Sequence, residues 1–401
     1  MMPRRTILMV ATLGLLPFPA DRFEALPPAP VFTRIVFGGD VMMSRYVGTL
    51  AHAKGDPAGP MRDIAPVFSA ADIAFVNLEA PFSDQGRPAT KGMIFKAAPD
   101  MIEALSVAGI DIVSTANNHA RDSGAYGVGF TVDWLAKHGI VAVGTAASGD
   151  VVHRGAVLER HGIRFGFLAY TFDQSNGNYK DSDERVAMLD PVRARQDIAA
   201  MRKRADVVIV SMHAGTEYQA KPNDQQREFA RAAIDAGAKV VVGHHPHVVQ
   251  PCEEYHGGVI FYSLGNLVFD QFQRKETQQG LVAELLFLGP TLMKYELLPV
   301  DIVRTAPRLR QENKPKPLSR LWGRPPGLQP TPRSASRAVA SCLNSPTRGS
   351  GADEGVCPTR AGPHLVAATA WRGQPGLSFF GQRARPIANR PQDATLQYIN
   401  S

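Results

Sequence analysis

Two short stretches of sequence decide the fold, and both end in histidine. Residues 207–213 read Val-Val-Ile-Val-Ser-Met-His, and residues 240–247 read Val-Val-Val-Gly-His-His-Pro-His. Each begins with a β-branched apolar run that is typical of a buried strand in a parallel sheet. A segment with helical spacing precedes each run, over residues 190–204 and 224–236. Repeated helix-then-strand units predict an α/β fold with a largely parallel central layer.

The same alternation extends over most of the chain. We expect strands over residues 33–38, 73–77, 110–115 and 140–143, and helices over residues 61–70, 99–109 and 126–138. Residues 151–159 and 163–170 flank His161-Gly162 and are expected to form a hairpin. Later strands, at 259–264 and 281–288, are expected to be mostly antiparallel. These features favour a two-sheet αββα sandwich over a Rossmann sheet, and no glycine-rich dinucleotide loop follows the first strand.

Side chains of the kinds that bind metal ions follow five of the expected strands. They are Asp40, Glu79, the run Asn117-Asn118-His119, His213, and the run His244-His245-Pro246-His247. The C-terminal ends of strands in α/β sheets open onto the ligand crevice, so these groups are expected to converge. Imidazoles and carboxylates together suit divalent ions such as Mn, Fe or Zn. One such histidine is commonly a packed residue, but several in one chain are hard to explain by packing, because buried unpaired polar groups cost free energy.

These residues fall into six motifs that occur in a fixed order between residues 33 and 304. The motifs are Gly38-Gly-Asp-Val-Met-Met-Ser-Arg45, Asn77-Leu-Glu79, Asn117-Asn-His-Ala-Arg-Asp122, His213-Ala-Gly-Thr-Glu-Tyr218, Gly243-His-His-Pro-His-Val248 and Tyr262-Ser-Leu-Gly-Asn266. The series resembles the CapA family of bacterial capsule and poly-γ-glutamate synthesis proteins, which is similar in fold to the calcineurin-like metallophosphatases. The resemblance implies a metallophosphatase-like αββα sandwich with two mixed sheets. It also implies a role in making, exporting or anchoring an anionic extracellular polymer, with membrane-bound synthesis or export subunits as possible partners.

The resemblance further implies a role for each residue of the site. The metal ligands would be Asp40, Glu79, Asn118, His213, His245 and His247, with Glu79 as the bridging carboxylate, and His119 would assist metal-dependent hydrolysis. Five residues would orient these ligands or contact substrate, namely Asn117, Asp122, Glu217, His244 and Asn266, although turn-stabilising hydrogen bonds would explain them equally well. The usual Asp-x-His of the first motif has Met42 in place of histidine. We therefore expect one tightly held divalent ion and a second that is weak or absent.

Two rival functions remain open at this point. The chain would be a stand-alone phosphoesterase without a polymer role, or a non-catalytic subunit whose metal site is only structural.

The N-terminus is typical of an export signal. Arg4 and Arg5 precede an apolar run over residues 6–18, which is shorter than a membrane-spanning helix requires. We expect residues 1–30 to be a signal peptide or an uncleaved membrane anchor with a spacer, and the protein to be periplasmic or extracellular. A misplaced start codon or a buried N-terminal helix are the alternatives.

The C-terminal segment differs in composition from the rest. The chain carries a net charge of +7, but residues 306–401 hold 14 Lys or Arg and only four Asp or Glu, which leaves −3 for the remainder. The same segment holds 13 of the 31 prolines. We expect a CapA-like domain over 31–305 and a disordered basic tail over 306–401; a polymer- or membrane-contacting segment and a frame-shifted end are the alternatives. The body has no basic stripe with interleaved aromatics, so we expect no nucleic-acid partner.

Overall fold

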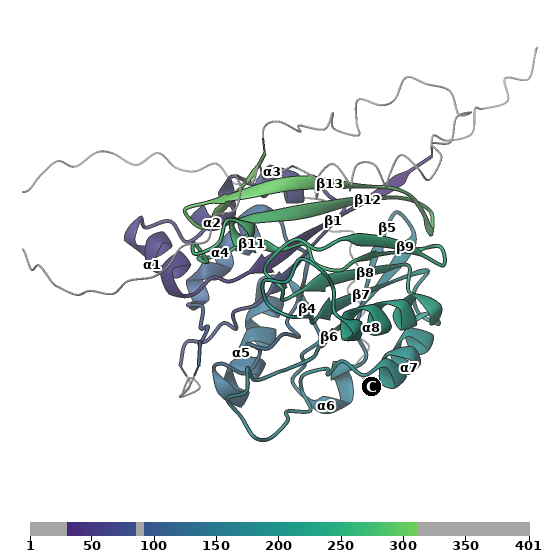
Figure 1. The fold of residues 1–401 in the computed structure, drawn as a ribbon, viewed down its shortest axis with the longest axis horizontal. Helices are drawn as coiled ribbons and strands as arrows, with labels where there is room; N and C mark the ends of the chain where they lie inside the picture. The colour runs from purple at the N-terminus through teal and green to yellow at the C-terminus, as the bar shows by residue number, and fades with distance from the viewer. Residues whose placement is uncertain (1–29, 86–91, 311–401) are drawn as a thin grey trace, which may run out of the picture. The chain divides into compact units, whose positions relative to one another are not determined.

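The computed structural model describes residues 30–85 and 92–310, and two mixed β-sheets pack face to face in it (Figure 1). The larger sheet has eight strands in the order β14-β13-β12-β1-β2-β3-β4, with β11 paired to β1. The smaller sheet has six strands in the order β5-β6-β7-β8-β10-β9. Each sheet contains a parallel core and antiparallel edges.

The strands follow the chain in this order: β1 (Phe32–Val41), β2 (Ile73–Leu78), β3 (Ile112–Ser114), β4 (Val141–Val143), β5 (Ala156–Arg160), β6 (Ile163–Thr171), β7 (Val207–His213), β8 (Val240–His244), β9 (Cys252–Tyr255), β10 (Gly258–Phe261), β11 (Asn266–Val268), β12 (Gln279–Leu288), β13 (Thr291–Val303) and β14 (Ala306–Leu309). The helices are α1 (Arg45–Ala53), α2 (Gly59–Arg62), α3 (Ala65–Ser69), α4 (Ile102–Ala108), α5 (Gly124–Lys137), α6 (Gly149–Val152), α7 (Pro191–Met201) and α8 (Asp224–Asp235), with 3-10 turns at Pro99–Met101 and Glu276–Gln278.

Alternation along the strands separates three apolar layers. In β1, Ile35 and Phe37 face the smaller sheet, whereas Val36 faces the helices α1 to α5 on the outer side. Phe75 of β2 stacks on Phe167 of β6 across the two sheets, with ring centroids 6.0 Å apart. Helices α6, α7 and α8 cover the outer face of the smaller sheet. The layers therefore run helix, sheet, sheet, helix, and the expected αββα sandwich is confirmed.

Local sequence signals explain where several helices begin and end. Asp190 caps α7 by accepting hydrogen bonds from the backbone N–H groups of Val192 and Arg193, and Pro191 occupies the first helical position. Asn223 and Gln226 form a reciprocal capping box at the start of α8. Gly109 ends α4 in the left-handed conformation, with φ of 68°.

Three expected elements differ from the observed ones. The helix expected over 61–70 is split into α2 and α3, because Pro66 cannot continue the preceding helical turn. The first hairpin strand begins only at Ala156, since residues 149–152 form α6 and Gly155 turns the chain with φ of 61°. The late strands were expected to be mostly antiparallel, and β12 is antiparallel to both β1 and β13. Strand β10 differs, because it pairs in parallel with β8 and antiparallel with β9.

The expected domain end at residue 305 falls short of the last strand. A turn at Arg304 and Thr305, both with positive φ, leads into β14, whose four residues pair with β13 at the sheet edge. Proline is compatible with an edge strand, which explains Pro307 within it. The expected signal segment (residues 1–29) and the tail beyond residue 310 lie outside the described residues. Within the described ranges, no helix has the length and apolarity needed to cross a membrane.

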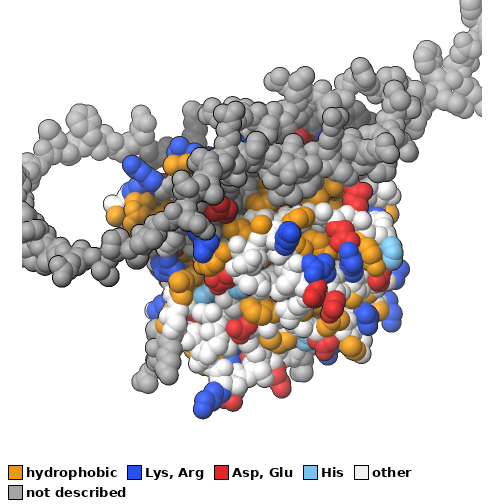
Figure 2. Space-filling view, viewed as in Figure 1, with side chains coloured by type: hydrophobic (Ala, Val, Ile, Leu, Met, Phe, Trp, Pro, Cys, Tyr) orange, Lys and Arg blue, Asp and Glu red, His pale blue; other side chains and the backbone are white. Residues whose placement is uncertain are grey.

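Charged side chains of both signs are intermixed on the surface. On the face shown in Figure 2, Lys and Arg side chains lie among Asp and Glu side chains over the described part of the chain. This mixture agrees with the weak net charge of the body.

Candidate metal centre

The predicted ligand-type residues lie where the strands of both sheets end. Asp40 belongs to β1, Glu79 follows β2 and Asn118 follows β3, all in the larger sheet. His213 ends β7 in the smaller sheet, and His245 and His247 follow β8 there. All of these side chains are buried. The strand ends therefore bring six side chains, far apart in sequence, to one place between the sheets.

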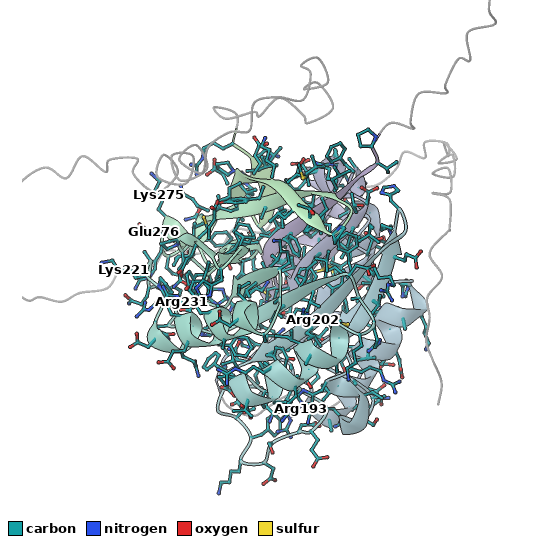
Figure 3. All side chains as sticks on the ribbon, turned by 90° about the vertical axis from the view of Figure 1, so that its right-hand side faces the viewer. Arg193, Arg202, Lys221, Arg231, Lys275 and Glu276 are labelled. Atoms are coloured by element: carbon teal, nitrogen blue, oxygen red, sulfur yellow. The ribbon has the colours of Figure 1, made fainter. Side chains whose placement is uncertain are left out.

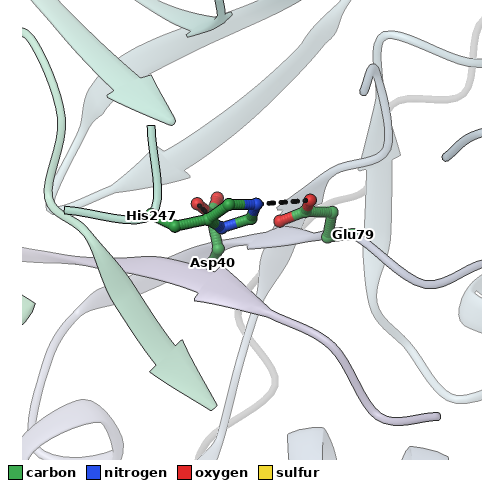
Figure 4. Close-up of side chains that lie close together, drawn as sticks. All are labelled: Asp40, Glu79 and His247. Atoms are coloured by element: carbon green, nitrogen blue, oxygen red, sulfur yellow. Dashed lines mark ion pairs between the residues drawn. The ribbon is translucent and has the colours of Figure 1, made fainter. Parts of the chain in front are cut away.

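Asp40, Glu79 and His247 form the centre of this group (Figure 4). One potential ligand atom of each lies within 4.8 Å of those of the other two. His247 Nδ1 is 3.5 Å from Asp40 Oδ2, and its Nε2 is 3.6 Å from Glu79 Oε1. The imidazole thus lies between two carboxylates from neighbouring strands.

His213 and His245 lie beside this centre. Their ring centroids are 4.9 Å apart, and that of His245 is 6.0 Å from that of His247. His213 Nε2 is 2.8 Å from Asn118 Oδ1. The backbone N–H of His245 donates to Asp40 Oδ2 at 3.2 Å. The structure therefore brings all six expected ligands into one connected cluster, while their role as ligands stays a prediction.

His119 is oriented by a carboxylate that is not in that cluster. Its Nδ1 lies 2.6 Å from Asp122 Oδ2, and the backbone N–H of Phe95 donates to the same oxygen at 2.6 Å. The Phe95 ring stacks on the imidazole with centroids 3.8 Å apart. His119 Nε2 faces Glu79, 3.9 Å from Oε1. Because a carboxylate that accepts from one ring nitrogen fixes tautomer and orientation, Nε2 is the nitrogen available to a substrate.

The residues expected to orient the ligands differ in their placement. Asn117 holds the loop after β3, since it donates to Leu78 O and accepts from the backbone N–H of His119. His244 Nδ1 is 3.5 Å from Asp40 Oδ1, and Asn266 Oδ1 is 3.0 Å from His247 Nδ1. Each of these side chains is buried beside the cluster.

Glu217 is the exception among the expected residues. It is exposed, and within the described residues it does not belong to the closely spaced group of Asp40, Glu79 and His247. Burial, and then the charge of Glu217, raise the pKa of the adjacent Tyr218 to about 12. Glu217 thus borders the site and acts on it through its charge.

Asn77 is a central residue of the site that was not among the expected ones. Its Nδ2 donates to Asp40 Oδ1 at 2.8 Å and lies 3.3 Å from His213 Nδ1, so it connects the two sheets. Asn77 belongs to β2, two residues before Glu79, and both side chains reach the cluster. Its place in the Asn77-Leu-Glu79 motif was the available signal.

Met42, which takes the place of the usual histidine of the first motif, turns its sulfur toward Ser44, whose backbone N–H and hydroxyl both donate to it.

The unpaired polar atoms of the cluster test whether a cation fits there. Both oxygens of Glu79, both ring nitrogens of His244, Nδ1 of His245 and Oδ1 of Asn77 are buried without a hydrogen-bond partner. Such atoms are costly to bury unless something binds them. Carboxylate oxygens and imidazole nitrogens are suitable ligands for divalent transition metals. The donor set therefore fits a divalent cation.

The pKa values of the two carboxylates of the centre shift in opposite directions. Burial raises the pKa of Glu79 well above its usual range, against the opposing charge of His247. Burial also acts to raise the pKa of Asp40, but contacts with His244 and His247 prevail and lower it well below its usual range. Asp40 is consequently ionised, whereas Glu79 resists ionisation unless a positive charge lies beside it.

The imidazoles divide in the same way. Burial lowers the pKa of His213, and lowers that of His245 to about 3, so both are neutral, which is the form that binds metals. Burial would also lower the pKa of His247, but Glu79 and Asp40 raise it to about 9. Without a metal ion, the His247 imidazolium thus supplies the positive charge beside these carboxylates, and His247 would have to lose that proton to bind a metal.

The fold and this cluster define a class of protein: a two-sheet α/β sandwich with a buried carboxylate–imidazole centre of metal-binding type at its strand ends. The family described as bacterial capsule synthesis protein PGA_cap matches residues 34–271, which is more than half of the chain. The chain belongs to this family.

Two relatives named for polymer or capsule biosynthesis are similar over more than two thirds of their length. The PGA biosynthesis protein CapA of Bacillus subtilis (strain 168) is 36% identical over 276 residues, which cover 68% of this chain and 72% of that protein. The capsule biosynthesis protein CapA of Bacillus anthracis is 31% identical over 290 residues, covering 70% and 68%. A crystal structure of a novel phosphatase from Mycoplasma pneumoniae superposes with a TM-score of 0.45 at 13% identity, covering 68% and 94%, a likeness too weak to bear on function.

Proposed function

We propose that this chain acts in the synthesis, export or anchoring of an anionic capsule polymer of the poly-γ-glutamate type. The family assignment supports this role, as does the similarity to two proteins named for poly-γ-glutamate and capsule biosynthesis. Because such a polymer lies outside the cell, we also propose that the protein is exported and works beyond the cytoplasmic membrane.

We further propose that the cluster holds a divalent metal ion that supports hydrolysis of a phosphoester or amide-like bond. The observation that carries this proposal is the buried group Asp40, Glu79 and His247, with both Glu79 oxygens unpaired. When bound, such an ion polarises an oxygen of the substrate and makes a water molecule more acidic. Asp40, Glu79 and His247 would hold it, together with Asn118, His213 and His245.

His119 supplies the proton transfer in this proposal. Asp122 holds Nδ1, so the imidazole presents Nε2 toward the cluster and toward the substrate bond beside it. A protonated Nε2 donates to the leaving atom as the bond breaks, and Asp122 stabilises the imidazolium before the transfer. Phe95 keeps the ring in plane by stacking on it.

The oriented His119 favours catalysis over a metal site that is purely structural. A structural ion needs ligands, but it needs no non-ligand imidazole held by a buried carboxylate with its second nitrogen directed at the centre. For the stand-alone phosphoesterase no comparable observation exists, since the relatives at 30% identity or more are named for polymer synthesis.

The full-length protein tests the proposal directly. Metal should be measured in the purified protein, and hydrolysis of bis(p-nitrophenyl) phosphate should be compared before chelation, after chelation and after restoring Mn²⁺ or Zn²⁺. His119→Gln should keep the metal and lose about 100-fold or more in kcat, as expected for a general acid. His52→Gln is the matched control, since His52 forms an exposed pair with Asp100 at 2.9 Å. Metal-independent hydrolysis, or equal losses in both variants, would refute the hydrolase proposal.

A further inference from the structure

Two arginines flank the cluster, and each lies over an aromatic ring that contacts a site imidazole. The Arg45 guanidinium carbon is 5.4 Å from the centroid of Phe95, the ring stacked on His119. The Arg274 guanidinium carbon is 4.9 Å from the centroid of Tyr218, whose ring is 6.3 Å from that of His247. The two cations thus border the cluster on the His119 side and on the His247 side. The proposed mechanism uses neither of them.

Arg45 is in a position that a purely structural residue would avoid. It has a left-handed φ of 51°, which is strained for a residue with a side chain. It is also the first residue of the nine-residue helix α1, where the helix dipole disfavours a positive charge. Asp270 compensates by an ion pair at 3.0 Å, yet the Arg45 side chain stays 28% exposed. A strained, partly exposed cation beside a reactive imidazole points to a ligand.

Tyr218 is fixed to the His247 side of the cluster by its backbone. Its φ is 63°, and its N–H donates to Pro246 O at 2.8 Å, between the two histidines of the turn. Gln271 donates to its hydroxyl at 3.4 Å. The ring therefore holds Arg274 at a fixed place, while the guanidinium has no ion pair within the described residues.

Basic side chains lie along one edge of the molecule. Figure 3 labels Lys221, Arg231 and Lys275 there, together with Glu276, and Lys275 directly follows Arg274 in the chain. These cations permit an anion to approach.

An exposed aromatic pair adjoins the two arginines. Tyr46 follows Arg45 directly and is 50% exposed; Phe272 is 44% exposed and lies two residues before Arg274. Their rings pack edge to face with centroids 5.9 Å apart. The segment from Asp270, which pairs with Arg45, to Arg274 joins these parts. The surface beside the cluster therefore presents a cation, then an exposed aromatic pair, then a second cation.

We infer that Arg45 and Arg274 bind successive carboxylates of an acidic chain laid across the cluster, and that Tyr46 and Phe272 contact the apolar spacer between them. A guanidinium matches a carboxylate through two parallel hydrogen bonds, and an aromatic face below it keeps the fork open for that contact. Two cations joined by an exposed aromatic pair suit a chain with repeated carboxylates rather than a small single anion. This inference rests on the proposed function, of which it names the substrate-binding residues.

Binding of a fluorescent γ-glutamyl oligomer of about ten residues to the full-length, metal-loaded protein tests the inference, with anisotropy as the readout. Arg45→Gln and Arg274→Gln should each weaken binding about tenfold, the value expected for a lost charge-assisted hydrogen bond. Arg45→Lys should restore only part of it, because an ammonium cannot form the fork. Metal content and thermal unfolding of each variant would show that the cluster and the fold persist.

Arg231→Gln is the matched control. Arg231 also lies over a tyrosine, with its guanidinium carbon 5.3 Å from the Tyr255 ring centroid, but it belongs to α8 and is paired with Glu253 at 2.8 Å. The variant therefore corrects for the general loss of one positive charge. Wild-type affinity in both arginine variants, or equal weakening in Arg231→Gln, would overturn the inference and leave the hydrolase proposal standing. Loss of binding in the two arginine variants of a protein without hydrolase activity would support binding of the acidic chain by Arg45 and Arg274 and refute the hydrolase proposal.

Discussion

Replacing Glu79 with glutamine should affect the metal-free and the metal-loaded protein differently. Both carboxylate oxygens of Glu79 are buried without hydrogen-bond partners, and His247 Nε2 lies 3.6 Å from one of them. A buried group without hydrogen bonds costs about 1–3 kcal/mol, which offsets the attraction within that ion pair, and glutamine keeps the shape while it removes the charge. We therefore expect Glu79→Gln to leave the unfolding free energy of the metal-free protein nearly unchanged.

The same substitution should abolish stabilisation by metal. A ligand present at 100 times its dissociation constant stabilises the folded state by about 2.7 kcal/mol. Wild-type protein should show this gain when Mn²⁺ is added, whereas Glu79→Gln should show little of it because the central carboxylate is lost. Urea unfolding followed by circular dichroism, with chelator and with excess Mn²⁺, measures both quantities.

Glu284→Gln provides the comparison for a buried carboxylate that is paired. Glu284 is also buried, but Arg34 lies 2.6 Å from it. Glu284→Gln removes the charge that pairs with Arg34, which should destabilise the protein with or without metal. If Glu79→Gln destabilised the metal-free protein as Glu284→Gln does, Glu79 would not be an unpaired group awaiting a cation, and the reasoning would be refuted.

Three further predictions concern the metal number, the acid limit of stability and the domain boundary. Metal-free protein should bind Mn²⁺ in one step, or in two steps of well-separated affinity. Met42→His should strengthen the weaker step in calorimetric titration, and an unchanged titration would argue that Met42 does not stand in place of a metal-binding histidine. Burial would raise the pKa of Asp197, but hydrogen bonds from His153, Arg193 and Tyr170 lower it, so its contribution to stability is present above the ordinary carboxyl pKa and is lost as pH falls through the lowered value. Asp197→Asn should therefore flatten the acid side of a stability–pH curve, and an identical curve would contradict this. A chain ending after residue 310 should keep the unfolding midpoint and metal content of the full chain, since the last described strand ends at Leu309; limited proteolysis that stops well beyond that point would show a larger folded unit.

The sequence predicts the sandwich and the place of its cluster because both follow from short-range patterns. An apolar run that ends in His213, or in His244 to His247, indicates both that a strand is present and that its end is polar. Parallel strands within each sheet place these ends along one edge, and the face-to-face packing of the two sheets brings the two edges together. The antiparallel edge formed by β13 and β14 was not predicted, because Lys, Glu and Pro interrupt its apolar pattern.

Other features depend on backbone conformation, which residue types do not reveal. The residue types of Arg45 and Tyr218 do not indicate a positive φ, yet that conformation directs each chain segment past the cluster. Asn77 was overlooked for a related reason. Asn77 lies within a strand and fits the strand pattern. Its contacts to Asp40 and His213 form only when the two sheets are packed.

The division of the cluster between the two sheets has a consequence for when the ion can bind. The carboxylates come from β1 and the end of β2, whereas the histidines come from the later strands β7 and β8. A nascent chain that has formed only strands β1 to β4 would hold the acidic half of the set and none of the imidazoles proposed as ligands. Metal uptake would then be a late event that requires the whole sandwich, and the choice of ion would reflect the compartment in which the chain completes its folding. Cells that change the metal content of that compartment would change the cofactor without changing a single residue.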